Sequence, residues 1–337
     1  MAQHGTCRDP VCITRVYLEG AFGIGKTTTA LAFVNGSRVN PVFFIGEPMM
    51  YWRNMAGDDA INGIYGTQVR RKNGEISDND AQRLTAYFQG LFCSPHSMLH
   101  ARILHLTVQN PNNLALKFFN NPVAIFDRHP VASNVCFPIS RYVVGDMTPA
   151  TLPGFLFAVS EEPEGTNLIV CTVSLTNHLT RITNRSRSGE IIDVQFILVL
   201  RNVYIMLINT IRYLQAKSDW LIDWFKLPFC SNSFKQQLQE KECITIQENP
   251  VIENTLFAVF KIPELCDSYG ELLDLWKWGM GVLANRLKNI SCYVLSLDTT
   301  PTDAVIELCK QLPNMTVSYL VPGGLAYLQE MSDSVNL

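Results

Sequence analysis

Five short apolar runs, rich in β-branched residues and bounded by turn or helix signals, are spaced along the chain. Such runs are typical of strands that are buried on both faces, as in a parallel sheet. They span Ile13–Glu19, Val42–Gly46, Val123–Phe126, Asn167–Val173 and Tyr293–Leu297. We therefore predict a sheet of five parallel strands.

Helical periodicity fills the longer segments between these runs. The predicted helices include Asp80–Leu91, Phe196–Leu214, Trp276–Asn289 and Pro301–Gln311. Strands that alternate with helices indicate an α/β fold, here a parallel sheet flanked by helices with a helical elaboration. Ligands of such folds bind at the carboxyl ends of the strands.

One predicted helix is apolar enough to suggest a membrane span. The stretch from residue 196 to 211 carries Arg201, Asn202 and Asn209, and it is short for a bilayer. We therefore expect a buried helix in a soluble protein, with no membrane partner.

Composition and charge narrow the classes of function. A hydrophobic fraction of 47% with only 17% charged residues predicts a large core and a buried subunit interface. The net charge of -3 argues against a nucleic-acid partner, because phosphate backbones attract basic surfaces. The ten cysteines include no C-x-x-C pair and no secretory signal opens the chain, so we expect free thiols in an intracellular compartment.

A phosphate-binding motif follows the first predicted strand. It reads G-x-x-x-x-G-K-T and consists of Gly20, Ala21, Phe22, Gly23, Ile24, Gly25, Lys26 and Thr27, after which Thr28 opens a helix-compatible segment. Glycines let successive backbone N–H groups point at phosphate oxygens, and the helix dipole adds positive potential. In this P-loop, Lys26 would reach the β- and γ-phosphates of ATP, and the Thr27 hydroxyl would bind Mg²⁺.

The motif by itself is compatible with a switch GTPase, a motor or a kinase. A GTPase would need D-x-x-G and N-K-x-D. The chain has no N-K-x-D, and its D-x-x-G, from Asp267 to Gly270, follows no predicted strand. A GTPase is therefore disfavoured.

Carboxylates at two strand ends favour a kinase. Glu47 follows the second strand, where a carboxylate can accept the proton of an attacking hydroxyl. Asp127 follows the third strand, a position suited to Mg²⁺, and Arg128 beside it can offset negative charge.

Three arginines, Arg181, Arg185 and Arg187, precede Glu190. Positions 181 and 185 share one face of a helix. Two interpretations stay open. The arginines form a solvated basic face, or they belong to a lid at approximately residues 178–190 that brings guanidinium groups to the ATP phosphates.

Several motifs, in order and at matching spacing, resemble the alphaherpesvirus thymidine kinases. They are Glu47–Arg53 (EPMMYWR), Ile64–Gln68 (IYGTQ), Asp127–Pro130 (DRHP) and Arg181–Glu190. The segments YFQGLFCSPH and RNVYIMLINTI are most similar to the varicella-like branch. The resemblance extends from about residue 15 to near residue 330, so it is far more specific than the phosphate motif.

This resemblance implies roles around the sugar and the phosphates. Glu47 is similar to the family's base for the 5′-hydroxyl, and Arg128 to the arginine beside the 5′-oxygen and the phosphate. Tyr65 and Glu190 match positions that contact the 3′-hydroxyl. The implied reaction transfers the γ-phosphate of ATP to thymidine, and it extends to deoxycytidine and nucleoside analogues.

The resemblance also implies a pocket for the base. Gln89 matches the glutamine that reads the pyrimidine edge, and Arg141 the arginine that approaches the base from its other side through water. Trp52 would form a wall, while Phe92 and Phe137, where many relatives have Met and Tyr, would sandwich the ring. Because a carboxamide can turn over, we expect Gln89 to serve thymine and cytosine alike.

We predict a single P-loop nucleoside kinase domain over residues 13–330. A flexible N-terminus at 1–12, a mobile acidic loop at 160–165 and a flexible tail at 331–337 complete the chain. The resemblance implies a homodimer that uses ATP and Mg²⁺. Two alternatives stay open: another P-loop nucleoside or nucleoside-monophosphate kinase, which would have more basic residues in the acceptor pocket, and a protein that binds ATP without catalysis, which the retention of Glu47 and Asp127 disfavours.

Overall fold

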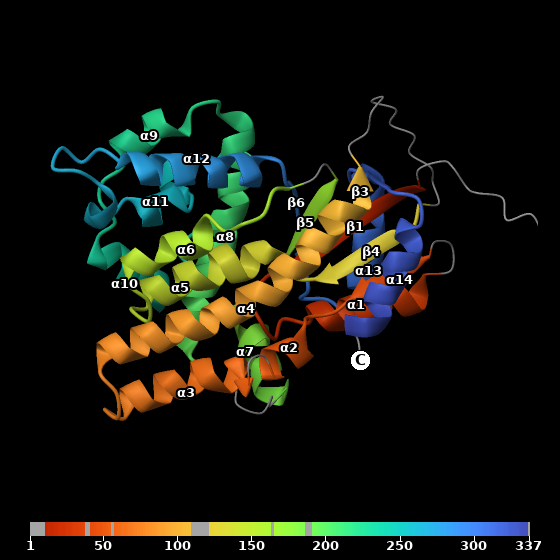
Figure 1. The fold of residues 1–337 in the computed structure, drawn as a ribbon, viewed down its shortest axis with the longest axis horizontal. Coiled ribbons are helices and arrows are strands. Elements are labelled where there is room, and N and C mark those ends of the chain that lie inside the picture. The colour runs from red at the N-terminus through yellow and green to blue at the C-terminus, as the bar shows by residue number, and fades with distance from the viewer. Residues whose placement is uncertain are drawn as a thin grey trace, which may run out of the picture.

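The computed structural model describes residues 11–37, 41–54, 57–108, 121–162, 165–185 and 191–335. A central parallel sheet is surrounded by helices (Figure 1). Its parallel strands are β1 (Val11–Glu19), β2 (Val42–Ile45), β4 (Val123–Asp127), β5 (Thr166–Thr172) and β6 (Ser291–Ser296), in the order β2-β4-β1-β5-β6. The predicted α/β fold with five parallel strands is confirmed.

Two short strands extend the sheet beyond the prediction. β7 (Ser318–Leu320) pairs antiparallel with the first residues of β1 and with β3 (Thr107–Val108). Strands of two or three residues show too little alternation to be recognised in a sequence. The sheet therefore has seven strands in the described part of the chain.

β1 runs through the centre of the sheet, between β4 and β5. Its apolar side chains, such as Ile13 and Val16, are fully buried. Because the strands are parallel, the carboxyl ends of β1, β2 and β4 meet at one edge. That edge carries Glu19, Asp127 and the segment that follows β2, so it brings the predicted catalytic groups together.

Helices cover the sheet and extend away from it (Figure 1). α14 packs on β2, α1 packs on α13, and α3 and α4 form a long pair that extends to the lower left of the sheet in this view. The helices are α1 (Lys26–Gly36), α2 (Met49–Asn54), α3 (Ala60–Lys72), α4 (Asp78–Leu106), α5 (Phe137–Val143), α6 (Leu152–Leu156), α7 (Leu175–Arg185), α8 (Val194–Ala216), α9 (Trp220–Lys226), α10 (Asn232–Glu240), α11 (Phe257–Phe260), α12 (Asp274–Lys288), α13 (Pro301–Gln311) and α14 (Gly324–Val335).

α8 is long and apolar enough to cross a membrane, but it lies inside the protein. The most apolar stretch of α8 has a mean hydropathy of 1.6, and 78% of it is buried. Its polar side chains are satisfied within the fold: Asn202 Nδ2 donates to the carbonyl of Leu238 at 3.0 Å, and Asn209 Nδ2 to that of Thr245 at 3.0 Å. The prediction of a buried helix fits this position.

α4 is longer than the predicted helix, which ended at Leu91. It begins at the N-cap Ser77, whose hydroxyl accepts from the N–H of Asp80, and it continues through Pro95 to Leu106. A proline inside a helix removes one backbone donor. The helix continues because its later turns are packed, with Ile103 buried in the core.

The C-terminal boundary also differs from the prediction. α14 continues to Val335, so the predicted tail that begins at residue 331 opens inside a helix. Met331 is buried in the core, and the Ser332 hydroxyl donates to the carbonyl of Phe44 at 2.7 Å. These contacts with β2 explain why the helix does not end at residue 330.

Candidate active site

The P-loop connects β1 to α1 as the motif predicts. Gly20, Gly23 and Gly25 have φ angles of 129°, 76° and 107°, which residues with a side chain rarely adopt. A Cβ on Gly20 would lie 2.5 Å from the carbonyl oxygen of Cys171, and one on Gly23 would lie 2.6 Å from Ile182 Cγ1. The loop is therefore held closely between β5 and α7.

Lys26 and Thr27 begin α1 beside the loop. Lys26 Nζ donates to the carbonyls of Ala21 at 3.0 Å and Gly20 at 3.4 Å. Burial lowers the pKa of Lys26, although the nearby Asp127 carboxylate opposes that shift. A lysine in this place is a desolvated positive charge at the phosphate site.

The Thr27 hydroxyl donates to Asp127 Oδ2, and Oδ1 of the same carboxylate is buried without a hydrogen-bond partner in the described residues. Burial, with the charge of Glu47, raises the pKa of Asp127 to about 6. A hydroxyl and a carboxylate oxygen are ligands that Mg²⁺ prefers, and the unpartnered Oδ1 offers a further one. These two residues fit the predicted metal site.

Arg128 stands at the centre of the site in a strained backbone conformation. Among the described residues it alone, apart from glycines, has a positive φ, 86°. Arg128 Nε lies 2.5 Å from Glu47 Oε1, and Nη1 donates to the carbonyl of Gly20 at 3.0 Å. The predicted base and the predicted arginine thus form an ion pair that reaches the P-loop.

Sequence analysis missed Glu19, which holds this arrangement in place. Its carboxylate is fully buried and accepts from the backbone N–H of His129 at 2.5 Å and the hydroxyl of Tyr204 at 2.9 Å. Arg128 Nη1 lies 3.6 Å from it. Only its place at the carboxyl end of β1, next to Gly20, could have indicated a role.

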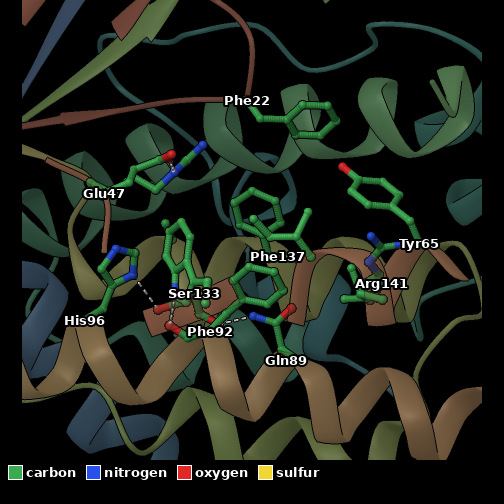
Figure 2. Close-up of a pocket in the computed structure, with 14 residues that line it drawn as sticks. Phe22, Glu47, Tyr65, Gln89, Phe92, His96, Ser133, Phe137 and Arg141 are labelled. Carbon is green, nitrogen blue, oxygen red and sulfur yellow. Dashed lines mark hydrogen bonds and ion pairs between the residues drawn. The ribbon is translucent and has the colours of Figure 1, made fainter. Parts of the chain in front are cut away.

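A cavity opens beside the Glu47–Arg128 pair (Figure 2). Every predicted substrate-binding residue in the described part of the chain lines it. Its walls are formed by Phe22, Glu47, Trp52, Ile61, Ile64, Tyr65, Gln89, Phe92, His96, Arg128, Ala132, Ser133, Phe137 and Arg141. The predicted Glu190 lies outside the described residues.

α4 supplies one wall of the cavity. Gln89 is 2% exposed, so it does not face solvent, and its Nε2 donates to the carbonyl of Ser133 at 2.8 Å. Trp52 packs edge-on against Phe92 and His96, with ring centroids 5.1 Å apart in both pairs. His96 and Ser133 were not predicted.

The opposite wall carries Phe137 and Arg141 from α5. Arg141 Nη1 lies 2.8 Å from Asp146 Oδ2, and its guanidinium stands 3.9 Å over the ring of Phe196. Both contacts fix the arginine at the cavity. Phe22 of the P-loop also lines the cavity, so one residue of the motif contributes to this wall.

α7, the first part of the predicted lid, is docked on the P-loop. His178 is buried, and its Nε2 lies 2.7 Å from the carbonyl of Phe22. The Arg181 guanidinium donates to the carbonyls of Ile24 and Leu297. This helix therefore shapes the loop from outside.

The other residues of the predicted lid follow Arg181 in the sequence. Arg185 is the last residue of α7 and is exposed. Arg187 and Glu190 lie outside the described residues, as does most of residues 1–12.

A buried cluster behind the site joins His100, His129 and Glu162. Such side chains can hold a metal ion, but one hydrogen bond in this cluster bears on which His129 nitrogen carries the proton. The N–H of Val131 donates to His129 Nδ1 at 3.1 Å, so Nε2 carries the ring proton toward Glu162 Oε1, 3.0 Å away. A metal would need that nitrogen unprotonated. Glu162 is thus buried within the loop that was predicted to be mobile.

The chain is similar to known proteins along nearly its whole length. The family model described as "Thymidine kinase from herpesvirus" matches residues 20–297. The thymidine kinase of varicella-zoster virus (strain Oka vaccine) is 53% identical over 327 residues, 96% of this chain and 95% of that protein. The thymidine kinase of feline herpesvirus 1 is 36% identical over 315 residues, 93% of this chain and 91% of that protein. A crystal structure of EHV4-TK complexed with Thy and ADP has a TM-score of 0.91 at 34% identity, covering 97% of this chain and 98% of that one.

Proposed function

The chain belongs to the herpesvirus thymidine kinases, and we propose that Glu47, Arg128 and Lys26 carry out its reaction. That reaction transfers the γ-phosphate of ATP to the 5′-hydroxyl of thymidine, giving dTMP and ADP. The position of the Glu47–Arg128 pair supports this assignment of the catalytic residues. Both side chains line the cavity, and Arg128 also reaches the P-loop carbonyl of Gly20.

The P-loop holds the phosphates of ATP through its backbone N–H groups and Lys26. Thr27 and Asp127 would hold Mg²⁺, which would supply positive charge to offset the charge of the ATP phosphates. Arg181 supports the loop through the carbonyl of Ile24, and with Arg185 and Arg187 it completes the proposed ATP site.

Glu47 orients the 5′-hydroxyl and takes its proton as the new O–P bond forms. Its ion pair with Arg128 holds the carboxylate in position at the cavity. The rest of the catalysis is mainly positioning and charge stabilisation, because a loose phosphoryl transition state demands little else. Arg128 remains beside the 5′-oxygen and offsets the charge that develops there.

The cavity suits a pyrimidine deoxynucleoside. Phe92 and Phe137 offer ring faces for stacking, and Gln89 offers polar atoms for the base edge. Tyr65, together with Glu190, is assigned to the 3′-hydroxyl. Stacking makes few directional demands, which is compatible with deoxycytidine and nucleoside analogues as further substrates.

A nucleoside-monophosphate kinase is the weaker alternative. Its pocket would need basic side chains to bind a second phosphate. The two arginines of the cavity each pair with a carboxylate, Arg128 with Glu47 and Arg141 with Asp146.

The experiment is a turnover assay with radiolabelled thymidine, ATP and Mg²⁺. We expect labelled dTMP and one ADP for each dTMP formed. Lys26→Ala should abolish transfer while thymidine still binds, and Lys310→Ala, in an exposed pair with Glu307 on α13, is the matched control. A folded wild-type protein that makes no dTMP contradicts the proposal.

Homodimerisation and an intracellular location complete the proposal. Large exposed apolar side chains occur on α9 and its following segment and on α12: Ile222, Phe225, Phe229, Leu275 and Trp278. A surface of this kind on a protein with few charges marks an interface. The described cysteines are all free thiols, as a reducing compartment in the cytosol or nucleus of an infected cell would require.

A further inference from the structure

The backbone carbonyl of Ser133 has lost its helical partner. It lies in a π-helical turn, η2 (Ala132–Cys136), that passes directly into α5. In this turn the N–H of Phe137 donates to the carbonyl of Ala132, whereas an α-helix would direct it to Ser133. Pro138 comes next and has no N–H to donate. The buried Ser133 carbonyl therefore needs donors from side chains.

Two side chains of α4 provide those donors. Gln89 Nε2 donates to the Ser133 carbonyl at 2.8 Å, and Cys93 Sγ donates to it at 3.1 Å (Figure 2 shows the first bond). The carbonyl can only accept, so it determines which end of the Gln89 carboxamide faces it. If the amide turned over, Gln89 Oε1 would lie against the Ser133 oxygen, two acceptors without a hydrogen between them.

We propose that the Ser133 carbonyl fixes the orientation of Gln89 and thereby makes the pocket select thymine over cytosine. The proposal rests on the thymidine kinase function proposed above. With Nε2 held at Ser133, Gln89 Oε1 accepts from thymine N3–H, and the second hydrogen on Nε2 donates to thymine O4. Both polar atoms of the thymine edge are satisfied without moving the amide.

Cytosine presents the opposite pattern, with N3 as an acceptor and the 4-amino group as a donor. Gln89 could match it only by turning over and breaking its bond to Ser133. The structure thus opposes the free turning of Gln89 that the sequence suggested. An unmatched polar edge in a buried pocket lowers kcat/KM by roughly ten- to a hundred-fold.

The test compares thymidine with 5-methyl-2′-deoxycytidine. The two nucleosides share the sugar and the 5-methyl group and differ only in the hydrogen-bonding edge. For the wild-type protein, we expect kcat/KM to favour thymidine by roughly ten-fold or more. Equal use of both nucleosides overturns this inference alone, whereas failure to phosphorylate thymidine contradicts the proposed function.

Two variants test whether Gln89 sets the ratio of kcat/KM for the two nucleosides. Gln89→Leu should lower kcat/KM for thymidine about ten-fold and change that for 5-methyl-2′-deoxycytidine much less, so that the ratio approaches one. An equal loss for both nucleosides would show a freely turning amide and overturn the inference. Cys309→Ala, at an exposed thiol of α13, is the control and should keep the wild-type ratio. A ratio that collapses in this control as well would also overturn it.

Discussion

Glu47 and Arg128 form an ion pair, so the position of each side chain depends on the other. Arg128 holds a φ of 86°, which persists only where the surroundings fix it. Glu19 does so by accepting from the next backbone N–H, that of His129, at 2.5 Å. The arginine side chain is therefore preorganised between the acceptor cavity and the P-loop, and Glu47 is aimed by it.

Replacement of Glu47 by Gln tests the base. Glu47→Gln keeps the shape of the side chain but cannot accept a proton, so kcat should fall roughly 100-fold or more. Thymidine affinity should stay near the wild-type value, because the base edge is bound elsewhere in the cavity. Steady-state kinetics and equilibrium binding check both expectations. Glu307→Gln, which breaks an exposed pair with Lys310, is the control, and near-normal turnover of Glu47→Gln would remove Glu47 from this role.

At the residue scale, sequence predicts what a side chain in a motif contributes. Lys26 and Glu47 are predictable because their chemistry and spacing identify them, and Gln89 because it matches a position of the family that the chain resembles. Glu19 is not, because an acid at a strand end has many possible uses. Ser133 is not predictable either, since it acts through a carbonyl that only a π-helical turn makes available.

At the element scale, α7 contacts the P-loop directly through its side chains. His178 and Arg181 contact the carbonyls of Phe22 and Ile24, and Ile182 packs where Gly23 leaves room. The sequence predicts a helix with arginines on one face. It does not predict the docking, because carbonyls of a loop carry no side-chain signal.

Substitution of Gly23 should disturb this docking. Gly23→Ala forces a side chain into a positive φ of 76° and places a Cβ 2.6 Å from Ile182 Cγ1. We expect the KM for ATP to rise roughly ten-fold, since strain of this kind costs about 1–3 kcal/mol. Initial-rate measurements over a range of ATP concentrations would show it. Gly36→Ala, at the end of α1 with no atom within 4 Å of the new Cβ, should leave the KM unchanged; equal effects of both substitutions would contradict the docking argument.

At the scale of the whole molecule, the parallel sheet is predictable and the cavity is not. Apolar runs identify five strands, but the order β2-β4-β1-β5-β6 and the small strands β3 and β7 depend on long-range pairing. The cavity combines residues from Phe22 to Arg141, and the resemblance to a family, not local pattern, indicated most of them. Pro95 likewise suggests a helix end that tertiary packing overrides.

Acid should destabilise the molecule through its buried histidines. Burial lowers the pKa of His96 to about 3 and of His100 and His178 to about 4, from an ordinary value of 6.5. In the unfolded chain these rings take up protons below pH 6.5, and in the folded chain they do not. The contribution of these histidines to the free energy of unfolding is therefore fully present above pH 6.5, and it is lost as the pH falls toward 4.

The slope of this loss can be measured. Each histidine that is neutral only in the folded state contributes about 1.4 kcal/mol per pH unit within the window. Urea unfolding between pH 7 and 4.5 should show the decline, and His178→Asn should make it shallower. The exposed His105 is the matched site, where His105→Asn should leave the slope as in the wild type. A flat profile down to pH 4.5 would contradict the argument.

The apolar surface of α9 and α12 predicts how two chains associate. Leu275 and Trp278 are 73% and 67% exposed and, three residues apart, share one face of α12. Lysines at both positions would place two charges in a dry interface, which costs several kcal/mol per unpaired ion. The double variant Leu275→Lys/Trp278→Lys should therefore sediment as a monomer at a concentration where the wild type has twice the mass of one chain. Met98→Lys, at an exposed apolar residue of α4, should remain dimeric. A monomeric wild type, or a double variant that stays dimeric, would show that this surface is not the interface.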